Sequence, residues 1–508
     1  MNGEANELIN KMVENLVSVS DERRYALTAA IGGYFSDRML PIMEALYDSV
    51  GNSDFGWIHG QVFFFDGRTY IPVPSDDYID RALELFLVKM RCPAFVVTRC
   101  RAQVIQKFHQ SLRLNRELKP RYNVMAFRNG VVDMNDGILR PFDPKYHVIY
   151  LHDYEYDPNA ECPVWKNFLR GGGKGNVGVL PDRNDRMILQ MFMGLGLFDR
   201  GYMQDKVENC LILYGNGSNG KSVIMETIMG VFGHDNVSTM GLGDLVSGGD
   251  ERLRSMAKVD GKVFNWGGEL QMKSMMGCED SVKSLFSGER QYGRLLGHDI
   301  YQITNVPWFV FNANKMPKWE DSTNGFHRRF IYLVFDRVIA DKDQNKRLTF
   351  ELQKEYPGIL NWVRRGRKYL EQNKFHFPDS KGSLRKKLIE IGRNNIGRSW
   401  LLAYNITAYP SNVKMIDSGM EVSFKDMYDS AVSYAAANGF DMSSFTANTF
   451  ASQLRTAGFG ASSKRKTSSD IMYRIFGAEK GFLMEDPVIV ADMDPDVEDP
   501  TALMDPED

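Results

Sequence analysis

Residues 208–233 read ENCLILYGNGSNGKSVIMETIMGVFG, and this stretch decides the fold. Its centre fits the pattern G-x-x-x-x-G-K-[ST] at every fixed position. The residues of the pattern are Gly215, Asn216, Gly217, Ser218, Asn219, Gly220, Lys221 and Ser222. An apolar run, 210–214, precedes them, and a helical run that ends at Gly233 follows. Strand, glycine loop and helix in this order predict an α/β domain with a phosphate-binding loop.

The residue types in this loop suit ATP and Mg²⁺. Glycines let backbone N–H groups turn inward around phosphates, and the N-terminus of the following helix adds partial positive charge. Lys221 can reach the β- and γ-phosphates, while the Ser222 hydroxyl can bind Mg²⁺. The loop alone does not decide whether the γ-phosphate passes to water, as in a motor or switch, or to a small acceptor, as in a kinase.

Two later segments place polar side chains after apolar strands. Glu269 follows the strand 262–266, and Asn314 follows the strand 307–311. The carboxyl ends of parallel strands meet at the edge that carries the glycine loop. A carboxylate there can serve Mg²⁺ and the attacking water, and an amide can orient that water against the γ-phosphate. Taken singly, such a Glu is as often a surface residue, and such an Asn is more often a turn former.

Two adjacent arginines, Arg328 and Arg329, precede another apolar strand, 331–335. They can form a solvated basic edge. In ring-shaped ATPases, however, one subunit lends an arginine from this position to the γ-phosphate of its neighbour, where it neutralises charge in the transition state.

The motifs together resemble a known family. GNGSNGKS, KVFNWGGE, SVKSLFSGERQYGRLL, FNANKMP and HRRF occur in that order. This series resembles the superfamily 3 helicases of the poxvirus and phage primase-helicase branch. FRNGVVDM, YDPNAECPVWKNFL and EYPGILNW look like the flanking segments of that branch, so the resemblance covers residues 120–480.

The resemblance implies an AAA+-like homo-hexamer that binds ATP between subunits and translocates on single-stranded or forked DNA in its channel. The residues that match its Walker A pair, Walker B acid, sensor and trans-acting arginine are Lys221, Ser222, Glu269, Asn314 and Arg328 or Arg329. A channel hairpin is expected around residues 294–299, with Arg294 and His298 on DNA phosphates.

The chain departs from the family at one position. Many of these motors carry two adjacent acids where this chain has Gly268 and Glu269. Either Glu269 alone serves both Mg²⁺ and water, or another acid such as Glu279 or Asp280 assists. The region before residue 120 is also too short for the polymerase-like domain of larger relatives. A separate primase, polymerase or single-strand-binding protein is therefore an expected partner.

The segment 395–480 resembles a winged-helix domain. Helices are predicted at 424–437 and 447–457, followed by the basic turn SSKRKTSS and a strand at 471–477. Lys464, Arg465 and Lys466 in this turn are predicted to touch DNA phosphates. The alternative is a domain that contacts another protein, with a solvated basic turn.

The remaining patterns divide the chain. Hairpins are predicted around Asp66-Gly67 and Asn135-Asp136-Gly137, and a mobile connection at Gly171–Gly175. The predicted parts are a helical and mixed N-terminal region (1–120), a segment before the motor (121–204), an AAA+-like P-loop ATPase core (205–340), a helical lid-like region (341–394), the winged-helix-like region (395–480) and an acidic disordered tail (481–508).

Composition limits the class of protein. The net charge of −3 includes an acidic tail with ten acids and no Lys or Arg, so the rest of the chain is basic enough to tolerate a polyanion. No run reaches the ~20 apolar residues of a membrane span, and the first residues are charged. Five scattered cysteines fit buried free thiols. The expected location is the cytoplasm, that of the host for a phage or viral protein.

These patterns predict an ATP-dependent replicative DNA helicase of a phage, virus or mobile element. The main alternative is a DNA-dependent AAA+ ATPase that loads or remodels other proteins without unwinding DNA. A small-molecule kinase is a further alternative, and it predicts activity as a monomer without any use for Arg328 or Arg329.

Overall fold

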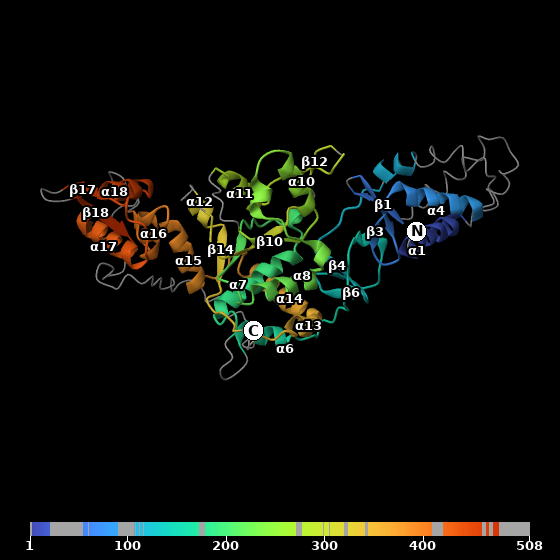
Figure 1. Cartoon of the computed structure of the whole chain (residues 1–508), viewed down its shortest axis with the longest axis horizontal. Helices are drawn as coiled ribbons and strands as arrows, with labels where there is room; N and C mark the ends of the chain where they lie inside the picture. Colours follow the sequence, from blue (N-terminus) through green and yellow to red (C-terminus); the bar gives the residue numbers. More distant parts are fainter. Residues whose placement is uncertain are drawn as a thin grey trace. The chain divides into compact units, whose positions relative to one another are not determined.

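The computed structural model describes most of the chain, as two compact units whose elements are labelled in Figure 1. The described residues are 3–20, 54–89, 106–171, 178–270, 277–408, 420–459, 464–466 and 471–476, except positions 59, 107, 111, 115, 298, 304, 318, 320–323 and 341–343. The first unit holds the described residues before Glu161, together with 197–199 and 231–236, and the second unit holds the others.

A parallel five-stranded sheet forms the centre of the second unit. Its spatial order is β14-β8-β13-β10-β9, and every neighbouring pair is parallel. The strands are β8 (Cys210–Tyr214), β9 (Val237–Ser238), β10 (Phe264–Glu269), β13 (Trp308–Ala313) and β14 (Phe330–Val334). Their buried residues form nearly continuous runs, as expected for a parallel sheet covered on both faces. The predicted α/β class is confirmed.

Strand β8, the glycine loop and helix α8 (Lys221–Phe232) follow one another as predicted. Two other strands run further than expected. β10 continues to Glu269, with an irregular register between Gly267 and Glu269, and β13 continues to Ala313. The extensions form because Glu269 pairs with Asn312 across the two strands, a contact between distant segments that local polarity does not reveal.

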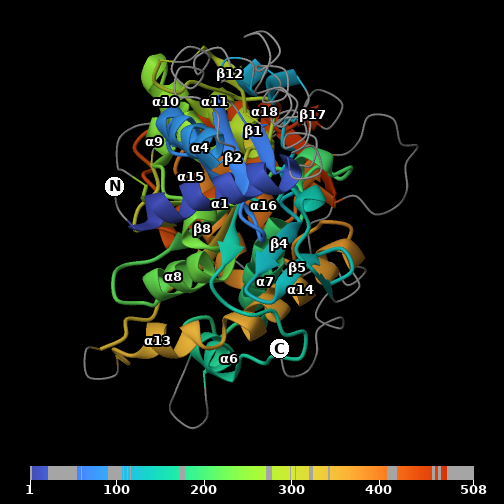
Figure 2. The same cartoon turned by 90° about the vertical axis from the view of Figure 1, so that its right-hand side faces the viewer.

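Helices cover both faces of the parallel sheet. On one face, Met256 and Phe286 belong to the same buried cluster as Ile212 and Phe311 of the sheet. These two residues come from α10 (Asp250–Val259) and α11 (Glu279–Phe286), and the short helix α9 (Leu242–Val246) joins the same cluster. In both views the strands lie between α10 and α11 on one side and α7, α8 and α14 on the other (Figure 1 and Figure 2).

Helices α7 (Arg183–Gly194) and α14 (Tyr356–Gln372) pack closely against each other. The Gln190 side chain donates a hydrogen bond to the carbonyl of Trp362 at 2.9 Å. A Cβ on Gly366 would lie only 2.0 Å from the carbonyl oxygen of Gln190, so the two backbones meet at this glycine. The segments before and after the strands of the parallel sheet therefore share one packed layer.

The first unit contains two small sheets. One has the order β1-β2-β3 and the other β6-β5-β4-β7. Their strands are β1 (Phe55–Ile58), β2 (Gln61–Phe65), β3 (Tyr70–Pro72), β4 (Val124–Phe127), β5 (Gly130–Asp133), β6 (Ile138–Arg140) and β7 (Leu151–His152), and helices α1 (Gly3–Ser20) and α4 (Asp76–Lys89) pack beside the first sheet. Both predicted hairpins form, although the first belongs to a three-stranded sheet rather than a strand pair.

The C-terminal part of the second unit combines four helices with a four-stranded sheet. The elements are α15 (Lys381–Gly392), α16 (Ile396–Ala403), α17 (Phe424–Ala437), α18 (Ala447–Thr456), β15 (Thr407–Ala408), β16 (Met420–Ser423), β17 (Lys464–Lys466) and β18 (Ile471–Phe476). Both predicted helices are present, and the Thr446 side chain caps the second one. The predicted basic turn is wrong at 464–466, because these residues pair with β18 as a strand.

Two further observations concern the described residues. None of their helices is long and apolar enough to cross a membrane. Cys162 and Cys210 are buried free thiols, and Cys278 is a half-buried one. Most of the predicted glycine connection and all of the acidic tail lie outside the described residues.

Asp185 in α7 makes stability depend on pH. Burial raises the pKa of its carboxyl group to about 6, although a hydrogen bond from Ser380 opposes this shift. Because the folded pKa is above the ordinary value of 3.8, the group stabilises the fold at low pH and loses this contribution as pH rises through about 6. We therefore expect Asp185→Asn to stabilise the protein by about 1–3 kcal/mol at pH 8 and to have little effect at pH 4.

Thermal unfolding of both proteins across this pH range measures the effect. The exposed acid Asp205 provides the control, since Asp205→Asn should not change the pH profile. Equal destabilisation by Asp185→Asn at both pH values would contradict the prediction.

Candidate functional site

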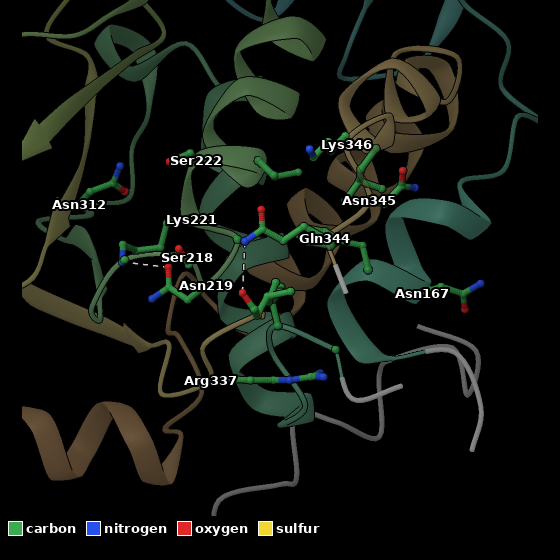
Figure 3. A pocket seen from close by; sticks show the side chains of 18 of the residues that line it. Asn167, Ser218, Asn219, Lys221, Ser222, Asn312, Arg337, Gln344, Asn345 and Lys346 are labelled. Atoms are coloured by element: carbon green, nitrogen blue, oxygen red, sulfur yellow. Dashed lines mark hydrogen bonds between the residues drawn. The ribbon is translucent and has the colours of Figure 1, made fainter. Parts of the chain in front are cut away.

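A cavity of about 780 Å³ lies at the carboxyl edge of the parallel sheet (Figure 3). The loop and the start of α8 contribute residues 217–223 to its lining, and the ends of β10 and β13 contribute Gly268, Asn312 and Asn314. The other walls come from the segment 337–351 and from helix α6 (Pro163–Arg170) with Gly178 and Val179. Five segments that are separated in the sequence therefore share one cavity.

Lys221 is held in place by oxygen atoms of its own loop. Its side chain is nearly buried, with 7% of the residue exposed. The Nζ atom donates to the carbonyl of Gly215 at 2.5 Å, to the carbonyl of Asn216 at 3.2 Å and to Oδ1 of Asn219 at 3.0 Å. A buried ammonium needs such partners, because an unpaired one costs several kcal/mol. Phosphate oxygens are equally suitable partners for this group.

The segment after β14 braces the loop from outside. Ile339 donates its N–H to the carbonyl of Ser218 at 2.7 Å, and the Asn219 side chain donates to the carbonyl of Phe335 at 3.2 Å. Ser218 has a positive φ of 58°, which is uncommon for a residue with a side chain. These contacts stabilise that conformation, so the shape of the loop depends on residues more than 100 positions later.

Polar residues at the strand ends approach the loop as expected. Ser222 is exposed and lines the cavity. Asn314 lies directly after β13 and lines the same cavity. Glu269 is the last residue of β10, next to Asn312 of β13, while its side chain lies outside the described part of the structure. The structure thus brings the backbones of all three predicted positions to one edge.

Sequence reasoning missed Asn312. This residue lies inside β13, faces the cavity and accepts a hydrogen bond from the Trp266 ring nitrogen at 3.3 Å (Figure 3). The sequence could have indicated Asn312, because FNANKMP contains two asparagines two positions apart. Alternate residues of a strand share a face. Glu279 and Asp280, the proposed supporting acids, do not line the cavity.

Sequence reasoning also missed the wall at 337–351. Arg337 and Lys346 line the cavity and are exposed, and they bring two positive charges to it in addition to Lys221. Gln344 donates its amide to the carbonyl of Ile339 at 3.2 Å (Figure 3). Glu351 also lines the cavity, so three cations and one acid leave a net positive charge, which favours a ligand with several negative charges.

Mg²⁺ fits the oxygen-rich edge of the cavity. The ion prefers oxygen ligands and usually binds through one or two protein groups together with phosphates and water. Ser222 offers a hydroxyl and Asn312 and Asn314 offer amides at this edge. No cluster of three or more His, Cys, Asp or Glu side chains suited to a metal occurs among the described residues. The hydroxyl and amide oxygens at this edge suit a Mg²⁺ ion whose other ligands are phosphate oxygens and water.

Arg328 and Arg329 lie at the opposite edge of the sheet. The carbonyl of Arg329 accepts the N–H of Cys210, the first residue of β8. The loop begins at the other end of β8, and a strand of five residues spans roughly 16 Å. Neither arginine lines the cavity. Within one chain, these side chains are therefore separated from the loop by the length of the strand.

Glu208 forms ion pairs with both arginines. Its carboxylate pairs with Arg328 at 2.5 Å, with Arg329 at 3.1 Å and with Lys206 at 2.9 Å. Burial raises the pKa of Glu208, but hydrogen bonds from Lys206 and Ser287 and the charge of Arg329 outweigh it and lower the pKa to about 2. The Arg328 side chain is 56% exposed, whereas that of Arg329 is 11% exposed. Of the two arginines, only Arg328 presents most of its side chain to solvent.

The hairpin in which DNA contacts were predicted is described by the structure. The expected hairpin exists as β11 (Tyr292–Gly293) and β12 (Tyr301–Gln302), which pair antiparallel. Arg294 begins its connection and forms an ion pair with Asp250 at 3.2 Å, while His298 lies outside the described residues. The exposed hydrophobic residues of this hairpin are Tyr292, Leu295, Leu296 and Ile300. The side chains of Lys464, Arg465 and Lys466 are also outside the described part.

Comparisons with known proteins match two segments of the chain. Residues 96–171 match the family described as "D5 N terminal like", and residues 213–329 match a "Family of unknown function" called DUF5906. The first segment contains α6, and the second contains the whole glycine loop and both arginines.

Solved structures of the C-terminal region of NrS-1 are similar to the chain. An apo structure has a TM-score of 0.41 at 11% identity and covers 85% of this chain and 98% of that one. An A-form apo structure has a TM-score of 0.42 at 12% identity and covers 85% and 99%. A second A-form structure has a TM-score of 0.36 at 13% identity and covers 64% and 77%.

Gly220 of the loop has little room for a side chain. Its φ is +90°, and a Cβ there would lie 2.8 Å from Val179 Cγ1 and 3.0 Å from Phe168 Cζ. We expect Gly220→Ala to destabilise the second unit by about 1–3 kcal/mol, through backbone strain and overpacking. Gly217→Ala is the matched control, since a Cβ on Gly217 meets no atom within 4 Å.

Thermal or urea unfolding of the two variants measures the difference. An unfolding midpoint of Gly220→Ala equal to that of Gly217→Ala would show that the loop does not have this geometry in solution.

Proposed function

We propose that the chain is an ATP-hydrolysing motor with an AAA+-like P-loop core that acts on DNA during replication of a phage, virus or mobile element. The observation that supports this proposal most directly is the cavity in which Lys221, Ser222 and Asn314 meet at one sheet edge. Open α/β sheets bind ligands outside the carboxyl ends of their strands. A triphosphate is the ligand that a glycine loop, a helix N-terminus and three cations suit best.

Each residue of the edge has a role in this proposal. Lys221 exchanges its loop oxygens for β- and γ-phosphate oxygens, and the loop N–H groups bind the remaining phosphate oxygens. Ser222 and Glu269 hold Mg²⁺, which neutralises charge on the phosphates when it is bound. Glu269 also accepts a proton from the attacking water, and Asn314 orients that water, with Asn312 beside it.

The opposite edge completes the site of a neighbouring subunit. An arginine that is separated from its own loop by a whole strand can reach a γ-phosphate only in another copy of the chain. We assign this role to Arg328, because it is exposed, and a structural role to Arg329, which is mostly buried between Glu208 and Ser287. A hexameric ring that encloses single-stranded or forked DNA satisfies this requirement.

The flanking regions fit a replication protein. The match of residues 96–171 to the D5 N terminal like family supports a relationship to phage and viral primase-helicases. In this proposal helices α17 and α18 and the β17–β18 pair belong to a winged-helix-like region, and Lys464, Arg465 and Lys466 make up its strand β17. In this proposal the region contacts DNA or a partner such as a separate primase, polymerase or single-strand-binding protein.

A second candidate is a DNA-dependent loader or remodeller that hydrolyses ATP without unwinding DNA. The exposed Leu296 and Ile300 of the β11–β12 hairpin favour it, because an apolar tip suits a protein partner as well as a DNA strand.

Lys221→Ala tests the ATP site. We expect the variant to keep its unfolding midpoint and to lose ATP hydrolysis by at least about 100-fold, because charge on the phosphates is no longer neutralised. Lys368→Ala, at an exposed lysine of α14, is the control. ATPase and forked-duplex unwinding assays are run on the same preparations. Retained ATP hydrolysis in Lys221→Ala would refute the ATP site. If DNA stimulated ATP hydrolysis in the unaltered protein but no strand were displaced, the loader would be favoured.

Arg328→Ala tests the ring. Mixing increasing amounts of this variant into the unaltered protein should reduce ATPase activity more steeply than simple dilution does, because each altered subunit impairs its neighbour. Arg385→Ala, at an exposed arginine of α15, should follow the dilution line. A trans-acting role would be contradicted if Arg328→Ala were fully active, or if it lowered the rate only in proportion to its amount. Full activity of the protein as a monomer would favour the kinase alternative.

A further inference from the structure

The cavity has two chemically different halves. Its lining carries the cations Lys221, Arg337 and Lys346, together with the acid Glu351. Helix α6 and the segment after it line the cavity with the apolar side chains Val164, Phe168 and Val179. Charged phosphates account for the first half only. The second half requires a ligand part that is apolar on its faces and lies within a few ångströms of the phosphates.

Phe168 brings this apolar half into contact with the phosphate loop. Its ring lies close enough to Gly220 that a Cβ there would be 3.0 Å from Cζ. The ring packs on Trp165 with a centroid distance of 6.0 Å, and Trp165 packs edge-on against Trp362 of α14 at 5.6 Å. Trp165 is fully buried, so Phe168 rests on a rigid base.

The backbone around Phe168 is fixed at both of its sides. Val179 donates its N–H to the carbonyl of Phe168 at 3.1 Å, which attaches the second apolar segment to the end of α6. At the start of α6, the N–H groups of Val164 and Trp165 both donate to the carboxylate of Glu355 at 2.9 Å. Carboxylates stabilise helix N-termini by accepting such otherwise unpaired N–H groups. Glu355 thus holds the helix that carries Phe168.

We infer that the nucleobase of the bound nucleotide packs in this slot against Phe168, and that Glu355 is the positioning residue of the slot. The inference rests on the proposed ATP site and adds its base-binding half. A nucleobase is the flat, apolar-faced group that a triphosphate carries, and aromatic rings bind any base through its face. Exposed amides of Asn167 and Asn345 line the same cavity and can meet the polar edge of the base.

Two ligands distinguish binding in the charged part of the cavity from binding in the apolar part. ATP has both phosphates and a base, whereas inorganic tripolyphosphate has only phosphates. Isothermal titration of the full chain with each ligand and Mg²⁺ should give tighter binding of ATP. Phe168→Ala should weaken ATP binding by about tenfold, the lower part of the range for base stacking, and leave tripolyphosphate binding unchanged.

Phe168→Tyr should restore ATP binding, because it keeps the aromatic face. Phe350→Ala is the matched control, since Phe350 is an exposed phenylalanine of α13 (Leu348–Gln353) that does not line the cavity. Loss of affinity for both ligands in a folded Phe168→Ala protein, or for neither, would overturn the inference.

Glu355→Gln gives a second test that leaves the cavity lining intact. The amide keeps the size of the side chain but can accept only one of the two helix N–H groups. We expect ATP affinity to fall about threefold, the effect of a weakened hydrogen bond, with no change for tripolyphosphate. A general loss of stability would lower the affinities for ATP and for tripolyphosphate alike. A change in the ratio of these two affinities therefore reports a change in the position of helix α6. An unchanged ratio in Glu355→Gln would contradict the role of Glu355.

Lys221→Ala separates this inference from the proposed function. It should weaken both ligands if the phosphate site is correct. Unchanged binding of both would refute the ATP site itself. Equal binding of ATP and tripolyphosphate by the unaltered protein, with both lost in Lys221→Ala, would keep the ATP site and reject the base slot.

Discussion

The ammonium group of Lys221 is nearly buried, and a cation in such a position is stable only where oxygen atoms surround it. The glycine loop supplies them by bending back on itself, which requires positive φ angles at Gly215, Ser218 and Gly220. The residues after β14 stabilise this bend through Ile339. The position of one charge therefore connects the loop, the central strand and the chain segment that leaves the sheet.

The parallel sheet both gathers and separates functional groups. Because all five strands point the same way, Glu269, Asn312 and Asn314 reach the edge where the loop begins. For the same reason, the residues that precede β14 lie at the far edge, a full strand length from the loop. The groups to which we assign a role at one phosphate thus share an edge, and the arginine that we assign to a neighbouring subunit lies far from its own loop.

Sequence patterns predicted the parts of this arrangement that depend on local chemistry. The loop motif between an apolar strand and a helix identified Lys221 and Ser222, and strand-end positions identified Asn314 and the backbone place of Glu269. Tight turns such as Asp66-Gly67 were predictable for the same reason, since glycine and aspartate favour them directly.

Contacts between distant segments were not predictable from local patterns. Residues 464–466 read as a turn because they are polar, yet they pair as a strand with β18. Glu208 carries no motif, and its role follows only from the arginines that are 120 positions later. The wall formed by Arg337 and Lys346 depends in the same way on how the chain returns to the loop after its last central strand.

The pairing of Glu355 with the start of α6 joins residues 190 positions apart, on either side of the segment that forms the parallel sheet. A protein truncated to begin at β8 would keep every residue of the glycine motif but lack one side of the cavity, and Glu355 would have no helix to hold. Recombination that moved only the motif-bearing segment into a related protein would meet the same incompatibility. The structural unit that contains the complete cavity is therefore the longer piece from α6 to α14.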